Sequence, residues 1–210
     1  VIFTMINSRK IPKTIQIKRK DFIINQIKDK SVMHIGCTGG LLGEENELEH
    51  INNYNKLEDT HYLFSKSAKK ISGIDISKKK IDFLKSQDFE NLYVADICDP
   101  NFNLEKKYDI ILFPNIIEHL SNVGLALQNI KKMMKEDSHL IITTNNAFDI
   151  LVILKLFFNY ESVHSEHTSY YSYSTMKRSL EMSELYIENF YYAYNEKKWE
   201  IKKKPSTIFI

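Results

Sequence analysis

The sequence predicts an α/β fold: a doubly wound sheet of seven strands, mostly parallel and closed by a C-terminal antiparallel hairpin. Short apolar runs of strand length alternate with segments whose apolar residues recur at helical spacing. Four of the six glycines lie within eight residues, directly after the first such run. Alternating strands and helices form parallel sheets with right-handed crossovers, so ligands should bind at the carboxyl ends of the strands.

Length and composition indicate an ordinary globular protein. We treat residues 1–210 as one domain, and its 43% hydrophobic and 27% charged residues are typical of that class. No apolar run approaches the roughly 20 residues of a membrane span, and 1–15 lack the pattern of a secretory signal. Two cysteines, Cys37 and Cys98, form no disulfide framework, so we expect a cytoplasmic location.

The first half of the chain alternates helices and strands. In order, the expected elements are an N-terminal segment and helix (1–30, helical from 18), a strand over 31–35, a helix over 60–70, a strand over 71–76, a helix from Ser77, and strands over 92–95 and 108–113. Asp59 precedes the second helix as a plausible N-cap. The run 108–113 is apolar enough to be buried on both faces of the sheet.

The second half predicts the end of the sheet. We expect a helix capped by Ser121, a strand over 140–144, a buried helix over 147–158, a helix over 175–182, and strands over 185–194 and 205–210. A lysine-rich turn joins the last two strands, which favours an antiparallel hairpin. Residues 159–175 are polar and aromatic without a period, and we expect them to form a lid.

Residues suited to bind a nucleotide-like cofactor follow successive strands. The glycine cluster allows the backbone to approach a ligand closely. Asp75 ends the second strand, where a carboxylate accepts hydrogen bonds from ribose hydroxyls. Asp96 and Ile97, after the third strand, suit the amine and the face of an adenine. Asn115 follows the fourth strand.

These motifs resemble the class I S-adenosylmethionine (SAM)-dependent methyltransferases, which have a Rossmann-like fold. The likeness lies in VMHIGCTGG (32–40), GIDIS (73–77), NIIEHL (115–120) and 166–176, the last similar to members that modify glycans or lipid-linked metabolites. The resemblance implies SAM as cofactor and these cofactor-binding residues: Gly36, Cys37, Thr38, Gly39, Gly40, Asp75, Ile76, Asp96, Ile97 and Asn115.

The chain departs from the family pattern at three places. His34 stands where the family usually has an acid near the cofactor's ammonium, and Thr38 stands where it has a glycine. Asp75 lies 35 positions after Gly40, against about 20 in a dinucleotide fingerprint. We assign the excess to an inserted cap segment, 41–58, over the cofactor mouth.

Methyl transfer to a hydroxyl needs a nearby base, and histidine suits that task at neutral pH. Four histidines are candidates: His61, His119, His164 and His167. We favour His167, in the predicted lid, with His119 after the fourth strand as the second catalytic residue. The lid tyrosines Tyr170, Tyr171 and Tyr173 either stack on the acceptor or pack on the scaffold.

We predict no metal site. Glu118 and His119 resemble a metal-binding stretch of RNA-terminal 2'-O-methyltransferases, in which a further acid stands three residues before the glutamate. Asn115 occupies that position here, so one hard carboxylate ligand is missing. We therefore expect Glu118 and His119 to cap or brace the following helix.

The predicted function is O-methylation of a small metabolite or a sugar-containing surface-glycan precursor. Two further readings stay open: a cofactor-binding module without catalysis that acts in a complex, and an RNA 2'-O-methyltransferase. Few arginines and a net charge of +2 disfavour nucleic acid as a partner. The incomplete Gly-x-Gly-x-x-Gly disfavours a dinucleotide-dependent oxidoreductase. The oligomeric state is open, with a homodimer among the options.

Overall fold

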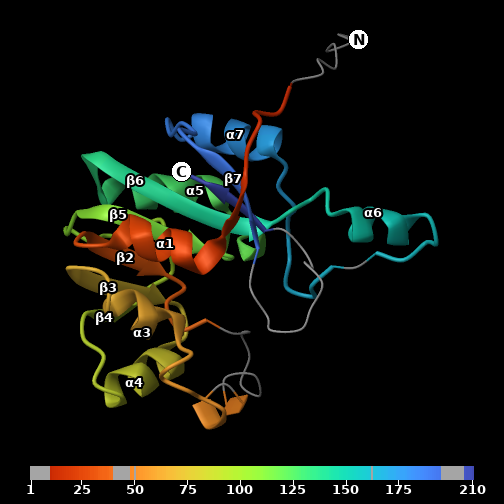
Figure 1. Cartoon of the computed structure of the whole chain (residues 1–210). Coiled ribbons are helices and arrows are strands. Elements are labelled where there is room, and N and C mark those ends of the chain that lie inside the picture. The colour runs from red at the N-terminus through yellow and green to blue at the C-terminus, as the bar shows by residue number, and fades with distance from the viewer. Residues whose placement is uncertain (1–9, 40–47, 50, 162, 195–205) are drawn as a thin grey trace.

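One eight-stranded sheet forms the centre of the molecule, with the strand order β1-β7-β8-β6-β5-β2-β3-β4 (Figure 1). The computed structural model describes residues 10–39, 48–49, 51–161, 163–194 and 206–210. Its strands are β1 Gln16–Lys18, β2 Ser31–Ile35, β3 Lys70–Asp75, β4 Leu92–Val94, β5 Tyr108–Pro114, β6 Met134–Asn145, β7 Phe190–Tyr194 and β8 Ser206–Phe209. Its helices are α1 Arg19–Ile27, α3 Thr60–Ser65, α4 Lys78–Ser86, η1 Ile117–His119, α5 Val123–Lys132, α6 Ile150–Leu156 and α7 Tyr173–Glu181.

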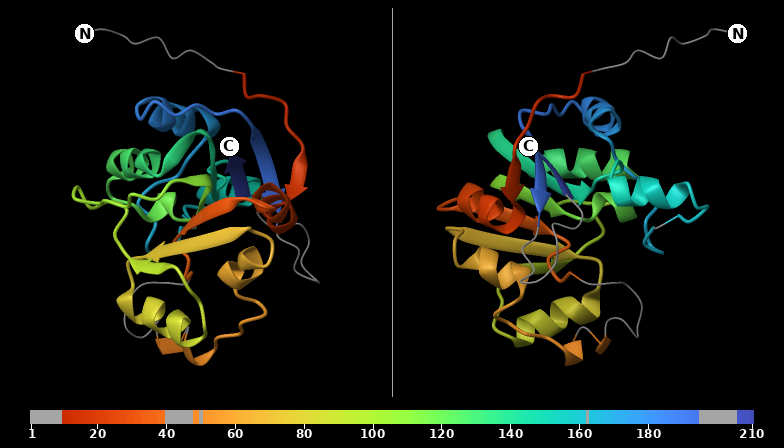
Figure 2. Two further views of the ribbon diagram at one scale, coloured as in Figure 1. Left: turned by 90° about the vertical axis from the view of Figure 1, so that its left-hand side faces the viewer. Right: turned by 45° about the vertical axis from the view of Figure 1, so that its right-hand side comes forward.

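The predicted α/β fold is confirmed, with one strand more than expected. β8 runs antiparallel to both β6 and β7, and the other strand pairs are parallel. The extra strand is β1, which pairs with β7 at the edge of the sheet (Figure 2). Its three residues, Gln16–Lys18, are held by backbone pairing and lack an apolar pattern long enough to reveal a strand.

Several element boundaries differ from those predicted. β6 is 12 residues long and begins directly after α5, rather than at residue 140. The N-cap of α5 is Asn122, whose side chain accepts from the backbone N–H of Leu125, so the prediction of Ser121 as the cap was wrong. β7 begins at Phe190 because the preceding residues form a turn in which the Leu185 N–H bonds to the Leu180 carbonyl. The lysine-rich turn lies outside the described residues.

Helices cover both faces of the sheet, and the strand alternation decides which side chains meet them. Ile110 and Leu112 of β5 pack in one buried cluster with α1 and α3. Ile111 and Phe113 of the same strand pack in the opposite cluster with α5 and α7. Figure 1 shows α1 and α5 on opposite sides of the sheet. The burial of β5 on both faces, predicted from its apolar run, is confirmed.

α6 projects from the sheet, and the prediction of a buried helix there was wrong. Ile150 is 62% and Leu154 46% exposed. Figure 1 and the right-hand view of Figure 2 show the helix standing away from the strands. Among the described helices, none has the length and apolar character needed to cross a bilayer.

Gly36, in the turn after β2, packs closely against Ile116, in the turn after β5. Its φ of +71° lies in the left-handed region, and a Cβ there would come within 2.3 Å of Ile116 Cδ1. Any larger residue therefore carries backbone strain and a steric clash together. Gly39 has a similar φ of +58°, but no atom of the described part of the chain lies within 4 Å of its Cβ position.

His34 and His61 form a buried pair between β2 and α3. The two side chains are 2% and 1% exposed, and their Nδ1 atoms are 3.1 Å apart, so one donates a hydrogen bond and the other accepts it. Burial holds the pKa of His34 well below its usual value and lowers the pKa of His61 to about 4. Both rings are therefore neutral in the folded protein at pH 7.

We predict that Gly36→Ala lowers the free energy of unfolding by about 3 kcal/mol, because it adds left-handed strain and a clash with Ile116. Gly39→Ala, with strain alone, should cost only about 1 kcal/mol. Urea denaturation of both variants measures the difference. Equal losses would show that the contact with Ile116 does not constrain this turn.

We also predict that acid destabilises the fold through the pair of His34 and His61. The unfolded chain protonates its histidines near pH 6.5 while these two stay neutral when folded, so unfolding takes up protons as the pH falls. Stability is retained above pH 6.5 and lost toward pH 4, at about 1.4 kcal/mol per pH unit for each proton taken up. The double variant His34→Leu with His61→Leu should show a shallower pH dependence in urea unfolding, and an unchanged slope would contradict this account.

Candidate active site

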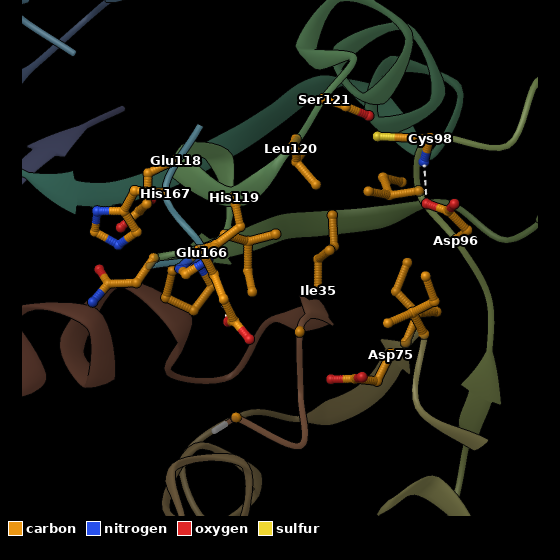
Figure 3. A pocket seen from close by; sticks show the side chains of 18 of the residues that line it. Ile35, Asp75, Asp96, Cys98, Glu118, His119, Leu120, Ser121, Glu166 and His167 are labelled. Atoms are coloured by element: carbon orange, nitrogen blue, oxygen red, sulfur yellow. Dashed lines mark hydrogen bonds and ion pairs between the residues drawn. The ribbon is translucent and has the colours of Figure 1, made fainter. Parts of the chain in front are cut away.

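A cavity of about 650 Å³ opens at the carboxyl ends of β2, β3, β4 and β5. Asp75 and Asp96 lie on one side of it, and Glu118, His119, Glu166 and His167 lie on the other (Figure 3). Parallel sheets bind ligands at this edge, because the strand order reverses there and loops leave a crevice. The cavity is therefore at the position that the topology predicts.

Asp75 is held in place by the glycine turn. Its Oδ2 accepts hydrogen bonds from the backbone N–H of Thr38 at 3.2 Å and from Thr38 Oγ1 at 2.7 Å, and its Oδ1 accepts from the Ser77 N–H at 3.0 Å. The carboxylate is 9% exposed and lines the cavity. Oδ1, which accepts the Ser77 N–H, has a second lone pair, so Asp75 can still accept from a ligand hydroxyl.

The predicted cofactor residues of the glycine turn differ in how they reach the cavity. Gly36 and Gly39 line it, whereas Cys37 and Thr38 do not. Cys37 is 2% exposed and packs with Ile81, Leu84 and Leu92. Burial raises the pKa of its thiol well above the usual value, so it is an inert packing residue. Gly40 lies outside the described residues, as do 41–47 and 50 of the predicted cap segment.

The residues predicted to face ribose and adenine line the same side of the cavity as Asp75. Ile76, Asp96 and Ile97 all belong to its wall. Asp96 Oδ1 accepts the Cys98 N–H at 2.8 Å, which turns its carboxylate at the end of β4 (Figure 3). Ile97 is 4% exposed and offers an apolar face.

Asn115 lines the cavity between its two sides. Its φ of 52° is left-handed, and its Oδ1 accepts from Thr143 Oγ1 at 2.6 Å and from Arg19 Nη1 at 3.2 Å. Arg19, on α1, thus extends from the N-terminal helix to the turn after β5. Sequence reasoning missed this residue, and its only signal was its being one of few arginines.

We had predicted that Glu118 and His119 cap or brace the next helix. That prediction was wrong for the cap, because Asn122 caps α5. The side chain of Glu118 is 1% exposed and lines the cavity. Its Oε2 is buried, and no described residue forms a hydrogen bond with it. Burial raises the pKa of Glu118 to about 6, although Arg19 nearby opposes the rise.

Three of the four candidate histidines come together at one wall. His119, on η1, and His164 and His167, between α6 and α7, form what we call the histidine cluster. The ring centroids of His119 and His167 are 4.7 Å apart, and those of His164 and His167 are 5.1 Å apart. Burial lowers the pKa of His119 and of His167, so both are neutral at pH 7. His61 does not line the cavity.

The tyrosines after the cluster divide between the cavity side and the core. Tyr171 is 7% exposed in the main cluster, and Tyr173 packs edge-to-face on Phe190 at 5.1 Å. Tyr170 lies 6.0 Å from the His167 ring. Only Tyr170 is therefore near the candidate catalytic groups.

Comparison with known proteins identifies the family. Residues 9–188 match the family described as "Methyltransferase domain". The chain is 28% identical over 134 residues to a ubiquinone biosynthesis O-methyltransferase of Pelagibacter ubique, covering 60% of this chain and 48% of that protein. It is 32% identical over 124 residues to N-methyltransferase 4 of Papaver somniferum, covering 56% of this chain and 31% of that protein. Both matches thus span less than half of the relative's length.

A solved structure supports the same fold. Magnesium protoporphyrin IX methyltransferase from Synechocystis, with bound SAH, aligns with a TM-score of 0.59 and 14% identity, covering 90% of this chain and 80% of that one. At this identity the likeness concerns the fold alone. The family match covers most of the chain, and it rules against the dinucleotide-dependent oxidoreductase. The chain belongs to the methyltransferase domain family, and it is a class I SAM-dependent methyltransferase domain.

Proposed function

We propose that this domain methylates a hydroxyl oxygen of a small metabolite or a sugar-containing glycan precursor, in the cytoplasm. The observation that carries the proposal is a single cavity with a positioned carboxylate, Asp75, on one side and the histidine cluster on the other. The similarity to an O-methyltransferase supports oxygen as the acceptor atom. Both cysteines are free thiols, which supports a reducing compartment.

We assign the adenosyl part of SAM to the side of the cavity that holds Asp75 and Asp96. The carboxylate of Asp75 would accept the ribose hydroxyls, while Ile97 would face the adenine. Gly36, Gly39 and Asn115 would border the methionine part. This arrangement leaves the space beside the histidine cluster for the acceptor.

The bound cofactor supplies a methyl group already activated on a sulfonium. The tasks of the chain are to exclude water, align the acceptor and take its proton. His167 is suited to take the proton, because it lines the cavity and its ring is neutral at pH 7. His119 lies edge-to-face against it and would position it.

His34 and Thr38, the two departures from the family pattern that suggested a loss of catalysis, each have a structural role. His34 belongs to the buried pair under α3 and does not line the cavity. Thr38 orients Asp75 through its hydroxyl. Neither residue therefore argues for an inactive module. An amine acceptor is the second candidate, favoured by the similarity to a plant N-methyltransferase.

We predict that Asp75→Asn weakens SAH binding at least tenfold, because a neutral amide accepts hydrogen bonds from hydroxyls less strongly than a carboxylate. Isothermal titration calorimetry measures the affinity. Asp82→Asn is the matched control, since Asp82 is half-exposed on α4 and pairs with Lys78 at the surface. Equal affinity in the two variants, or tight binding of a nicotinamide dinucleotide by the parent chain, would contradict the assignment.

We predict that His167→Ala lowers turnover at least a hundredfold while SAH affinity stays unchanged, a loss typical of removing a proton acceptor. The assay is SAH release with a panel of hydroxyl and amine metabolites. Turnover of the parent chain should fall as the pH drops below 6.5 and the ring protonates. The control His139→Ala removes a histidine that pairs with Glu188 away from the cavity. Unchanged turnover in His167→Ala would remove this residue from the reaction.

A further inference from the structure

The histidine cluster has the arrangement of a metal site. The ligand atoms of His119, His164 and His167 all lie within 4.8 Å of one another, and each ring is half-buried. In the part of the chain that the structure describes, this is the one group of three potential metal ligands that lie so close together. The prediction of no metal considered Glu118 and His119 with Asn115, and it did not consider imidazoles from the segment after α6.

The backbone brings these ligands together from two distant segments. The Thr168 and Ser169 N–H groups donate to the Glu118 carbonyl at 2.8 and 3.3 Å, and Thr168 Oγ1 donates to the Leu120 carbonyl at 2.8 Å. These bonds hold residues 164–167 against η1. None of these bonds involves a histidine ring, so replacing a single ring leaves them possible.

We propose that the histidine cluster binds a divalent transition-metal ion, preferably Zn²⁺, with an open coordination position toward the cavity. Three imidazole nitrogens suit Zn²⁺, whereas Mg²⁺ prefers oxygen ligands. Ligand nitrogens around tetrahedral Zn²⁺ lie about 3.4 Å apart. Small side-chain rotations bring the cluster to that spacing.

The surroundings of the cluster match those of metal-bound histidines. Glu166 Oε2 lies 3.8 Å from His119 Nδ1, so a carboxylate faces this ring, as is usual for metal-bound histidines. His167 Nδ1 is buried and has no hydrogen-bond partner among the residues that the structure describes. His164 Nδ1 accepts the Glu166 N–H at 3.2 Å, a long hydrogen bond that an ion at this nitrogen would replace.

The ion would act on the acceptor of the proposed function, on which this inference rests. A metal-bound hydroxyl has a lowered pKa and loses its proton to water. The O–CH₃ bond then forms as the S–CH₃ bond breaks, and the cofactor leaves as its thioether. With an ion bound, the imidazoles hold the metal and His167 no longer takes the proton itself.

The test is titration of the full chain, free of any affinity tag and stripped with EDTA, with Zn²⁺ in a calorimeter. We expect one Zn²⁺ per chain, and at least tenfold weaker binding in His164→Ala. His139→Ala should bind as the parent does. Co²⁺ should give the visible absorption of a four-coordinate site in the parent and lose it in His164→Ala. Thermal melting checks that each variant is folded.

Two outcomes overturn the inference: no stoichiometric Zn²⁺ in the folded parent, or equal affinity in the parent and in folded His164→Ala. SAH binding and turnover of the stripped protein are measured in parallel. Turnover that is full without Zn²⁺ leaves the proposed methyl transfer intact and refutes the role of the metal. Stoichiometric Zn²⁺ without methylation of any acceptor refutes the proposed function and leaves the metal site standing.

Discussion

The close approach of Gly36 to Ile116 is the constraint on which the rest of the site depends. It brings the turn after β2 against the turn after β5, since a Cβ on Gly36 would meet Ile116 Cδ1 at 2.3 Å. The first turn carries Thr38, which orients Asp75, and the second carries Asn115, Glu118 and His119. Because strands β2 and β5 are neighbours in the sheet, their pairing and this contact together keep the two turns side by side along the cavity wall.

The turn after β2 also contains Thr38, one of the residues that depart from the family pattern. A threonine at position 38 fills space that a glycine would leave open, and its hydroxyl fixes the carboxylate that it contacts. Gly73 in turn leaves room for the side chain of Cys37, since a Cβ there would lie 2.6 Å from the Cys37 sulfur. The side chain of Cys37 in the turn is thus accommodated because the neighbouring strand β3 has a glycine beside it.

The sequence predicted most of the sheet correctly, for a physical reason. Strand runs such as 108–113 are continuous in the chain, and Asp75 follows one directly, so local pattern determines where they lie. β1 was not predicted, because a strand of three residues at a sheet edge, with Ile17 as its one apolar side chain, is too short to show an alternating pattern. The exposure of α6 was not predicted either, since an apolar run of this length does not reveal whether the body of the protein covers it.

The histidine cluster shows why the wall of the cavity that it lines could be predicted only in part. His119 and His167 were chosen for their separate positions, and nothing in the sequence relates the loop after α6 to η1. That relation arises from backbone N–H groups of Thr168 and Ser169 donating to the Glu118 carbonyl, and every residue offers such donors and acceptors. Such backbone contacts do not require particular residue types, so the sequence does not reveal them. The chemistry of single residues could therefore be read from the sequence, while the meeting of three imidazoles could be found only in the folded chain.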